Sequence, residues 1–352
     1  MAQIRTGIQE VDARHRLDVG RLEAYLRGGI EGFAGPLRVR QFVGGQSNPT
    51  YHLADGEREW VLRRKPPGQL VHSAHAVDRE FRILSALAKV DFPSPRPRLY
   101  CADEAVIGSE FYVMDRIEGR ILVDQTLPGW TPEERRSLYA SQIAILARLH
   151  ALDPETIGLG DYGKPGNYFA RQIHVWGKQY ATADVPRSAA MERLIEWLPA
   201  NVPDDASTSI VHGDYGLNNM IIHPSEPRIV AILDWELSTL GHPLADLTYH
   251  LAGRLSPGGQ FEGLADDRLR ELGIPTRDEY VRAYCERTGR GEGIPDLDFY
   301  LAFHLFRTAG IMFGIAGRAK AGTAAGSEAS ELGKLALPLA ERALALARRL
   351  GA

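Results

Sequence analysis

Three polar residues in the segment 211–222, VHGDYGLNNMII, have the types and spacing of a catalytic loop. Asp214 lies between a glycine and a turn-prone Tyr-Gly pair, Asn219 follows it, and His212 precedes both. A carboxylate accepts the proton of a reacting hydroxyl group, and an amide oxygen binds a hard metal ion. The alternative is an ordinary polar loop in front of a strand, and the residues that follow decide between the two.

A predicted β-hairpin after this loop brings a second acidic residue close to it. Residues 220–222 and 229–233 are short apolar runs, and HPSEP between them has the composition of a turn. Residues before the first strand of a hairpin lie beside those after the second, so we expect Asn219 and Asp234 to be neighbours. Such oxygens suit Mg²⁺, and Asp214 would stand close to the same point. Phosphoryl transfer requires this arrangement.

The elements that must position these residues begin with a β-rich lobe. Asp18 is a predicted N-cap of a short helix, and apolar spacing predicts another helix over 76–89. Alternating or β-branched runs predict strands within 37–45, 50–54, 59–64 and 109–117.

The character of the chain changes after Gly119. Thr131 to Glu134 has the form of a capping box and opens a helix that reaches about His150. Most of the remainder is predicted to be helical apart from 210–234, with one final helix over 331–350. We therefore expect an α+β, bilobal fold: a nucleotide-binding N-lobe over 1–117, and a helical C-lobe over 118–352 with the catalytic loop and the acceptor site.

Three segments resemble the aminoglycoside phosphotransferase and choline kinase group, a branch of the protein-kinase-like fold. HGDYGLNN is similar to its catalytic loop, ILDWE to its metal-binding segment and PLADLTYHL to the block that follows. The resemblance covers about residues 42 to 249. It implies that His212 and Asp246 support the catalytic loop, the latter by hydrogen bonds.

The resemblance also implies ATP and Mg²⁺ as cofactors and assigns nucleotide-binding roles in the N-lobe. Arg63 occupies a position where many relatives have Lys, and Glu80 on the next helix would hold it. A guanidinium group binds phosphate oxygens in a bidentate manner. In the loop 44–53, GGQSNPTYHL, Ser47 and Asn48 are candidate phosphate donors, although the loop lacks the GxGxxG pattern.

FYVMDRIEG, residues 111–119, is similar to the hinge strand of the same group. The backbone of Asp115 and Ile117 would then pair with the adenine edge. A finer resemblance links VLRRKPPGQL, DREFRILSAL and DWELSTLGHPLADL to the kinase-like domains fused to acyl-CoA dehydrogenases, members 10 and 11 of that family. The remaining residues leave no room for a dehydrogenase domain, so we expect a stand-alone version.

The segments expected on the acceptor side are basic and aromatic. They are 168–180 and the predicted helix 298–320, although the apolar residues of the latter also fit a core helix. An anionic, partly apolar acceptor such as a hydroxy acid or hydroxyacyl thioester suits them better than a polycation. The candidate acceptor residues are Arg171, Trp176, Lys178, Tyr180 and Arg307.

Composition limits the remaining possibilities. The net charge of -4 gives no support to nucleic-acid binding, and two cysteines do not make a disulfide framework. The sequence has no run of 18 apolar residues and no apolar signal-peptide core. We expect a cytoplasmic protein, a monomer or homodimer, with a small hydroxyl compound as substrate and with no nucleic-acid or membrane partner.

Two alternatives stay open beside an active kinase of this kind. One is a nucleotide-binding regulator without turnover, which Arg63 keeps possible and the intact set of Asp214, Asn219 and Asp234 argues against. The other is an aminoglycoside-type or choline-type kinase. A protein kinase is disfavoured, because no activation-loop segment fits between Asp234 and Pro243.

Overall fold

The computed structural model describes residues 7–43, 48–66, 76–291, 293–322 and 329–352, in two compact units. The first unit comprises Met1–Gln142, Asp153–Gly160 and Gly216–Ser238, and the second comprises Ile143–Leu152, Asp161–Tyr215 and Thr239–Ala352. These units differ from the two lobes expected from the sequence, and the assignment of the lobes to nucleotide and acceptor stays a prediction.

A six-stranded antiparallel sheet forms most of the first unit. The strand order is β1-β2-β3-β4-β6-β5, so the last two strands are exchanged relative to the sequence. The sequence did not predict β1 or the proline-flanked β5. The strands are β1 (Ile8–Gln9), β2 (Arg38–Phe42), β3 (Thr50–Ala54), β4 (Glu59–Arg64), β5 (Pro97–Cys101) and β6 (Phe111–Asp115).

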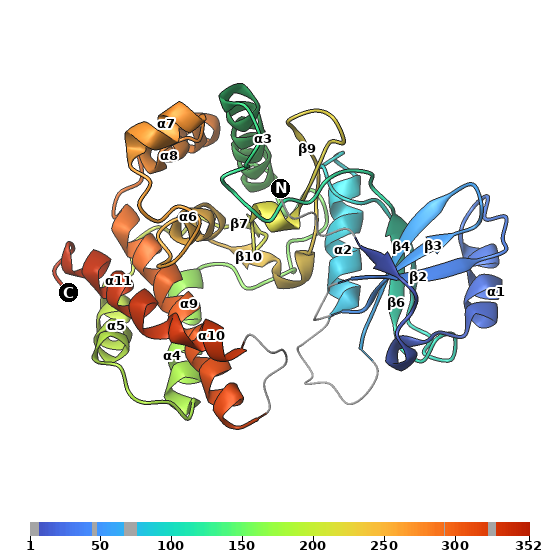
Figure 1. Cartoon of the computed structure of the whole chain (residues 1–352), viewed down its shortest axis with the longest axis horizontal. Helices are drawn as coiled ribbons and strands as arrows, with labels where there is room; N and C mark the ends of the chain where they lie inside the picture. Colours follow the sequence, from blue (N-terminus) through green and yellow to red (C-terminus); the bar gives the residue numbers. More distant parts are fainter. Residues whose placement is uncertain (1–6, 44–47, 67–75, 292, 323–328) are drawn as a thin grey trace. The chain divides into compact units, whose positions relative to one another are not determined.

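Two helices, α1 (Val19–Gly29) and α2 (Val77–Ala88), lie on either side of this sheet (Figure 1). Asp18 caps α1 as predicted, since its side chain accepts a hydrogen bond from the amide of Arg21. Leu22 and Leu26 of α1 belong to a buried cluster with side chains of β3, β4 and β6. The helix α2 packs against β5 and β6 and carries Glu80 into the protein interior.

The first unit extends past the predicted lobe boundary because the chain there pairs with a hairpin. Its strands are β8 (Met220–Ile222) and β9 (Ile229–Ile232), antiparallel to one another. The amide of Arg120 donates to the carbonyl of Ile222 at 2.8 Å, and the reverse bond has the same length. A Cβ at Gly119 would overlap Ile221 and the Ile222 carbonyl, so only glycine fits there. This pairing ties the hinge segment to the hairpin.

The predicted capping box at the start of α3 (Pro132–His150) is confirmed. The Thr131 hydroxyl accepts from the amide of Glu134 at 3.2 Å, and the Glu134 carboxylate accepts from the amide of Thr131 at 2.7 Å. The two bonds satisfy amides that have no partner within the helix. The helix ends at His150, where the sequence predicted its end.

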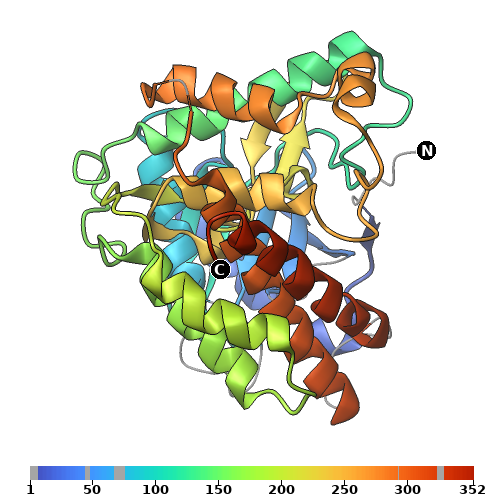
Figure 2. The same ribbon diagram turned by 90° about the vertical axis from the view of Figure 1, so that its left-hand side faces the viewer.

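The second unit is mostly helical. The helix α9 packs against both α4 and α11 (Figure 2). Two short strands, β7 (Ser209–Val211) and β10 (Thr239–Gly241), pair antiparallel next to the predicted catalytic loop, and β10 was not predicted. The helices are α4 (Tyr168–Thr182), α5 (Ala189–Ala200), α6 (Leu244–Gly253), α7 (Asp266–Leu272), α8 (Arg277–Thr288), α9 (Leu297–Lys320), α10 (Ala329–Lys334) and α11 (Ala336–Arg348).

The final helix predicted over 331–350 is instead two helices, α10 and α11, separated at Leu335. Pro338 explains the break, because its ring would clash with the carbonyl of Lys334 in a continuous helix and it has no amide to donate. The helix α9 is the one helix of the described ranges that is long and apolar enough to cross a membrane, but 67% of that window is buried inside the protein. This burial favours a core helix.

Candidate active site

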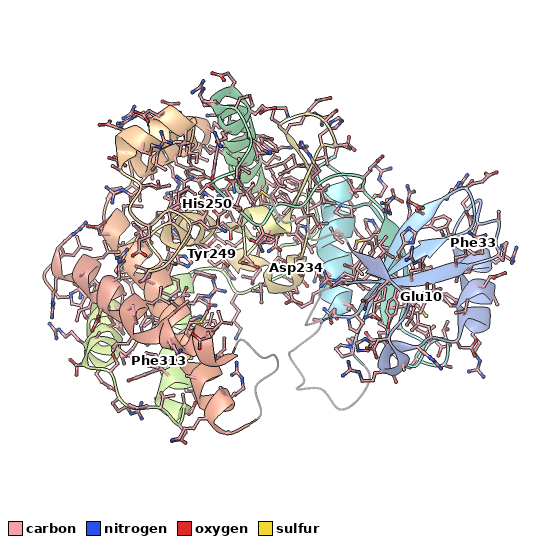
Figure 3. All side chains as sticks on the ribbon, viewed as in Figure 1. Glu10, Phe33, Asp234, Tyr249, His250 and Phe313 are labelled. Atoms are coloured by element: carbon pink, nitrogen blue, oxygen red, sulfur yellow. The ribbon has the colours of Figure 1, made fainter. Side chains whose placement is uncertain are left out.

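The β8–β9 hairpin places Asn219 and Asp234 beside one another, as the sequence predicted. The two residues flank the strands, Met220 pairs with Ile232, and the amide of Leu233 donates to the carbonyl of Asn219 at 2.8 Å. Asp234 has φ 64° and ψ 61°, a left-handed conformation that is uncommon outside glycine. This backbone turns the chain sharply at the end of β9, where Figure 3 labels Asp234.

Arg63 on β4 joins this hairpin to α2. Its Nε lies 3.2 Å from the Glu80 carboxylate, so the predicted ion pair is confirmed. Its two terminal nitrogens donate to Oδ1 of Asp234 at 3.2 and 3.1 Å, and one of them lies 3.8 Å from Glu236. One cation therefore holds three carboxylates, two of which the sequence analysis had not linked to it.

Burial sets the protonation of this cluster. The Glu80 side chain is 1% exposed, and loss of hydration raises the pKa of its carboxyl to about 7, although Arg63 opposes this shift. The carboxylates of Asp234 and Glu236 add to the increase, because one guanidinium group cannot neutralise three acids. The Tyr112 hydroxyl donates to Glu80 at 3.3 Å and fixes the carboxyl from the sheet.

A cavity of about 490 Å³ opens from this cluster along the hinge segment, entirely within the first unit. Its charged and polar lining includes Arg63, Glu80, Asn219 and Asp234. Its other walls are largely apolar side chains and the backbone that follows β6. These walls include Val61, Met114, Asp115, Ile117, Gly119, Ile121, Ile221 and Leu233. A cavity with an apolar part and a charged part fits a ligand with a flat base and an anionic tail.

The hinge residues Asp115 and Ile117 both line this cavity. The Asp115 amide already donates to the carbonyl of Arg96 at 2.9 Å, and its side chain pairs with Arg98 at 2.6 Å. Of the two backbone groups of Asp115, the carbonyl is therefore the one that would accept a hydrogen bond from a base. Ser47 lies outside the described residues. Asn48 also lines the cavity, where its amide donates to Glu236 at 3.4 Å.

The predicted catalytic loop is braced within the second unit by α6. One oxygen of the buried Asp246 accepts from the amide of His212 at 2.7 Å, and the other accepts from Gly213 at 2.8 Å, which confirms the predicted brace. Gly213 has φ 86°, a conformation that favours glycine and lets both amides point the same way. The ring of His212 accepts from the amide of Asp214 at 3.2 Å, consistent with its predicted supporting role.

Two further residues contact this loop. The Tyr249 hydroxyl, on α6, donates a hydrogen bond to Oδ1 of Asp214. Arg307, on α9, donates to the carbonyl of Gly213 at 3.3 Å. The sequence predicted a role for Arg307 but not for Tyr249. Tyr249 comes three residues after Asp246, and this spacing places Tyr249 and Asp246 on one face of a helix. That spacing was a usable signal.

The five candidate acceptor residues lie in three different environments. Arg307 lies over the rings of Trp176 and Tyr249, 5.5 Å from each centroid, so the structure brings Trp176 and Arg307 together beside the loop. Tyr180 is completely buried, and its hydroxyl accepts from the amide of Ser188 at 2.7 Å, so its prediction as a surface for the acceptor is wrong. Its ring packs in the core because α4 turns that face toward Phe313 of α9.

Among the described residues, no hydrogen bond, ion pair or ring contact is seen between the remaining candidates, Arg171 and Lys178, and the pair Arg307 and Trp176. Arg171 donates to the carbonyls of Gly166 and Lys164, the latter at 2.6 Å, and so holds the turn before α4. Lys178 is exposed on α4. Asp214 belongs to the second unit and Asn219 and Asp234 to the first, so their joint action in one site stays a prediction.

Sequence relatives support the resemblance. Residues 38–294 match the model of the phosphotransferase enzyme family. The chain is 42% identical to acyl-CoA dehydrogenase family member 11 of Gallus gallus, over 99% of this chain and 46% of that protein. It is also 42% identical to family member 10 of Mus musculus, over 94% of this chain and 31% of that one. The chain spans less than half the length of these curated relatives.

Solved structures confirm the predicted α+β, kinase-like fold. A crystal structure from Ralstonia eutropha, assigned provisionally to the aminoglycoside phosphotransferases, has a TM-score of 0.86 at 46% identity and covers 95% of this chain and 99% of that one. Choline kinase from Cryptosporidium parvum has a TM-score of 0.66 at 11% identity, covering 95% and 96%. Aminoglycoside phosphotransferase APH(4)-Ia, in a ternary complex with AMP-PNP and hygromycin B, has a TM-score of 0.57 at 17% identity, covering 93% and 97%.

Proposed function

Because the chain belongs to the phosphotransferase enzyme family, we propose that it transfers the γ-phosphate of ATP, with Mg²⁺, to a hydroxyl group of a small molecule. The cavity of the first unit carries this proposal: the hinge backbone, Arg63, Glu80, Asn219 and Asp234 all line it. A fold neighbour holds the ATP analogue AMP-PNP, which further supports a nucleotide as the ligand.

The residues present fit the two cofactors. Asn219 and Asp234 offer amide and carboxylate oxygens, the ligands that Mg²⁺ prefers. Among the described residues no group of three or more His, Cys, Asp or Glu side chains could hold a metal ion, and Mg²⁺ commonly takes its remaining ligands from phosphates and water. Arg63 would bind phosphate oxygens with its terminal nitrogens while Nε stays on Glu80, and the hinge carbonyl of Asp115 would accept from the base.

The proposed role of Asp214 is to accept the proton of the acceptor hydroxyl. ATP supplies the phosphoryl group, and Mg²⁺ offsets the charge on the phosphates. The brace from Asp246 holds the backbone of the loop, so the Asp214 carboxylate needs little reorganisation when a hydroxyl group arrives. The intact carboxylates and Asn219 favour turnover over a regulator that only binds nucleotide.

For the acceptor we propose an anionic, partly apolar molecule such as a hydroxy acid or a hydroxyacyl thioester. Arg307 beside the catalytic loop and the ring of Trp176 support this choice. A cationic sugar would meet repulsion there, and juxtaposed like charges cost several kcal/mol when desolvated. An anion would gain charge-assisted hydrogen bonds instead.

Two measurements test the proposal. A thermal-shift series with ATP analogues, with and without Mg²⁺, should show stabilisation that needs both. Product formation should then be followed with short hydroxy acids, their thioesters, choline and kanamycin-type compounds in competition. Transfer to the anionic compounds supports the full proposal. Transfer to the cationic compounds alone would refute the acceptor class and keep the kinase, whereas Mg²⁺-independent binding without any transfer would favour the regulator.

A further inference from the structure

The side chain of Tyr249 contacts the Asp214 carboxylate directly, through a hydrogen bond from its hydroxyl group to Oδ1. It lies on α6, where Figure 3 shows it next to His250, and it comes three residues after Asp246. Residues at this spacing share a face of a helix. A single turn of α6 therefore holds the backbone of the catalytic loop through Asp246 and the reactive side chain of the loop through Tyr249.

The ring of Tyr249 is itself fixed from α9. The Arg307 guanidinium group lies over the ring, 5.5 Å from its centroid, while the same group donates to the carbonyl of Gly213 at 3.3 Å. The ring of His304 packs edge-on against Tyr249 at 5.8 Å between centroids. His250, the next residue of α6, stacks on Tyr280 instead and so lies on another side of the helix. Tyr249 thus has little freedom to turn away from Asp214.

In this contact the Tyr249 hydroxyl group is always the hydrogen-bond donor. Burial and the adjacent Asp214 carboxylate raise the pKa of the Tyr249 phenol well above its usual value, so the hydroxyl keeps its proton at physiological pH. A carboxylate that accepts this bond through Oδ1 cannot rotate about its Cβ–Cγ bond without breaking it. The direction of Oδ2 is therefore set by Tyr249.

We propose that Tyr249 is a positioning residue that fixes the orientation of the Asp214 carboxylate for the acceptor hydroxyl. This inference rests on the proposed function, in which Asp214 is the proton acceptor. Tyr249 does not exchange a proton or touch the acceptor in this role. Its loss should slow the transfer step, because a small misplacement of a catalytic group costs up to about 100-fold in rate. Nucleotide binding, which uses residues of the other unit, should be unaffected.

The test compares Tyr249→Phe, which removes the hydroxyl and keeps the ring beneath Arg307, with Tyr300→Phe as a matched control. Tyr300 is another buried tyrosine of the second unit, stacked on His242. The readouts are kcat and KM with an acceptor that turns over and with water as the acceptor, and the Kd of AMP-PNP with Mg²⁺. We expect Tyr249→Phe to lower kcat about 10- to 100-fold and to change the Kd less than about twofold, while Tyr300→Phe changes neither.

A double-mutant cycle on stability separates this inference from the proposed function. Tyr249→Phe, Asp214→Asn and the double variant are unfolded in urea. The change in the unfolding constant of the double variant should differ by at least about twofold from the product of the changes in the two single variants. Additive effects together with a kcat equal to that of Tyr300→Phe would overturn the inference. If Asp214→Asn keeps full activity, or if no acceptor is phosphorylated, the proposed function fails. The double-mutant cycle would then still show whether Tyr249 and Asp214 interact, because it measures stability and not activity.

Discussion

Arg63 donates two hydrogen bonds to a single carboxylate oxygen of Asp234, a residue 171 positions further along the chain. A metal ion at Asp234 would compete for this oxygen, because two cations at one acceptor repel each other. Under the proposed function, the guanidinium group would move from Asp234 to the phosphates, while Nε, which lies 3.2 Å from Glu80, would keep that contact.

Arg63→Ala should weaken binding of AMP-PNP with Mg²⁺ by about 10- to 100-fold, the usual value of hydrogen bonds to charged groups. Arg63→Lys should lose less, because it keeps the charge but not the bidentate geometry. Isothermal titration calorimetry gives both values. Arg193→Ala is the control, since its pair with Glu196 is exposed and such pairs contribute only about 0–1 kcal/mol. An Arg63→Ala affinity equal to that of the control would remove Arg63 from the nucleotide site.

Asp234→Ala should abolish the Mg²⁺ dependence of nucleotide binding, and Asn219→Ala should weaken it, because the hairpin places these two residues beside one another and both offer oxygen ligands. Calorimetric titrations of AMP-PNP at several Mg²⁺ concentrations provide the measurement. Asp204→Ala, which removes a carboxylate outside the hairpin, is the comparison. Unchanged Mg²⁺ dependence in both site variants would mean that the metal binds elsewhere.

Asp214→Asn should abolish phosphoryl transfer while the Kd of AMP-PNP stays within about twofold. The loss should appear in kcat, as expected when an interaction made only in the transition state is removed. Steady-state kinetics with the acceptor identified in the competition assay, together with a Kd measurement, test both parts. Near-normal turnover in this variant would refute the assignment of Asp214 as the base.

Stability should depend on pH through Glu80. Burial raises its pKa from 4.5 to about 7 in the folded protein, so between these values the folded state binds more protons than the unfolded chain. The contribution of Glu80 to the unfolding free energy is therefore fully present below about pH 4.5 and is lost as the pH rises through about 7. Glu80→Gln should remove this part of the decline.

The measurement is urea unfolding of the wild type and Glu80→Gln across that pH range. Glu286→Gln, at an exposed site on α8, is the control for loss of an acidic side chain. A decline with pH that is the same in all three proteins would show that Glu80 ionises in the folded state as it does in the unfolded chain.

Gly119→Ala should lower nucleotide affinity without changing any polar group. A Cβ there would overlap Ile221 and the carbonyl of Ile222, so the hinge must move away from β8 and reshape the cavity. The control is Gly28→Ala, since a Cβ at that helical position meets nothing within 4 Å. Gly129→Ala would not serve as a control, because Gly129 has φ 87°, a conformation that strains alanine. Calorimetry and urea unfolding of both variants would separate the loss of affinity from the loss of stability.

The amino-acid sequence was enough to predict the contacts between residues that lie close together along the chain. Asn219 and Asp234 are joined by a short hairpin, so turn composition and two apolar runs were enough to pair them. The capping box at Thr131 and the N-cap at Asp18 are local in the same sense, because each bond spans only three residues. The resemblance to known kinases added Arg63, Glu80 and Asp246.

Contacts between side chains that are distant in the sequence became visible in the folded structure alone. The bonds of Arg63 to Asp234 and of Tyr249 to Asp214 depend on how separate elements pack. The spacing of Asp246 and Tyr249 indicates a shared helix face, but it does not indicate which segment that face contacts. Tyr180 is an example of a prediction that failed because it depended on packing. Its segment is amphipathic, and packing of α4 against α9 buried a residue that was expected to contact the acceptor. Periodicity fixes which residues share a face of a helix, but the free energy of burial, summed over all packed elements, selects the face that turns inward.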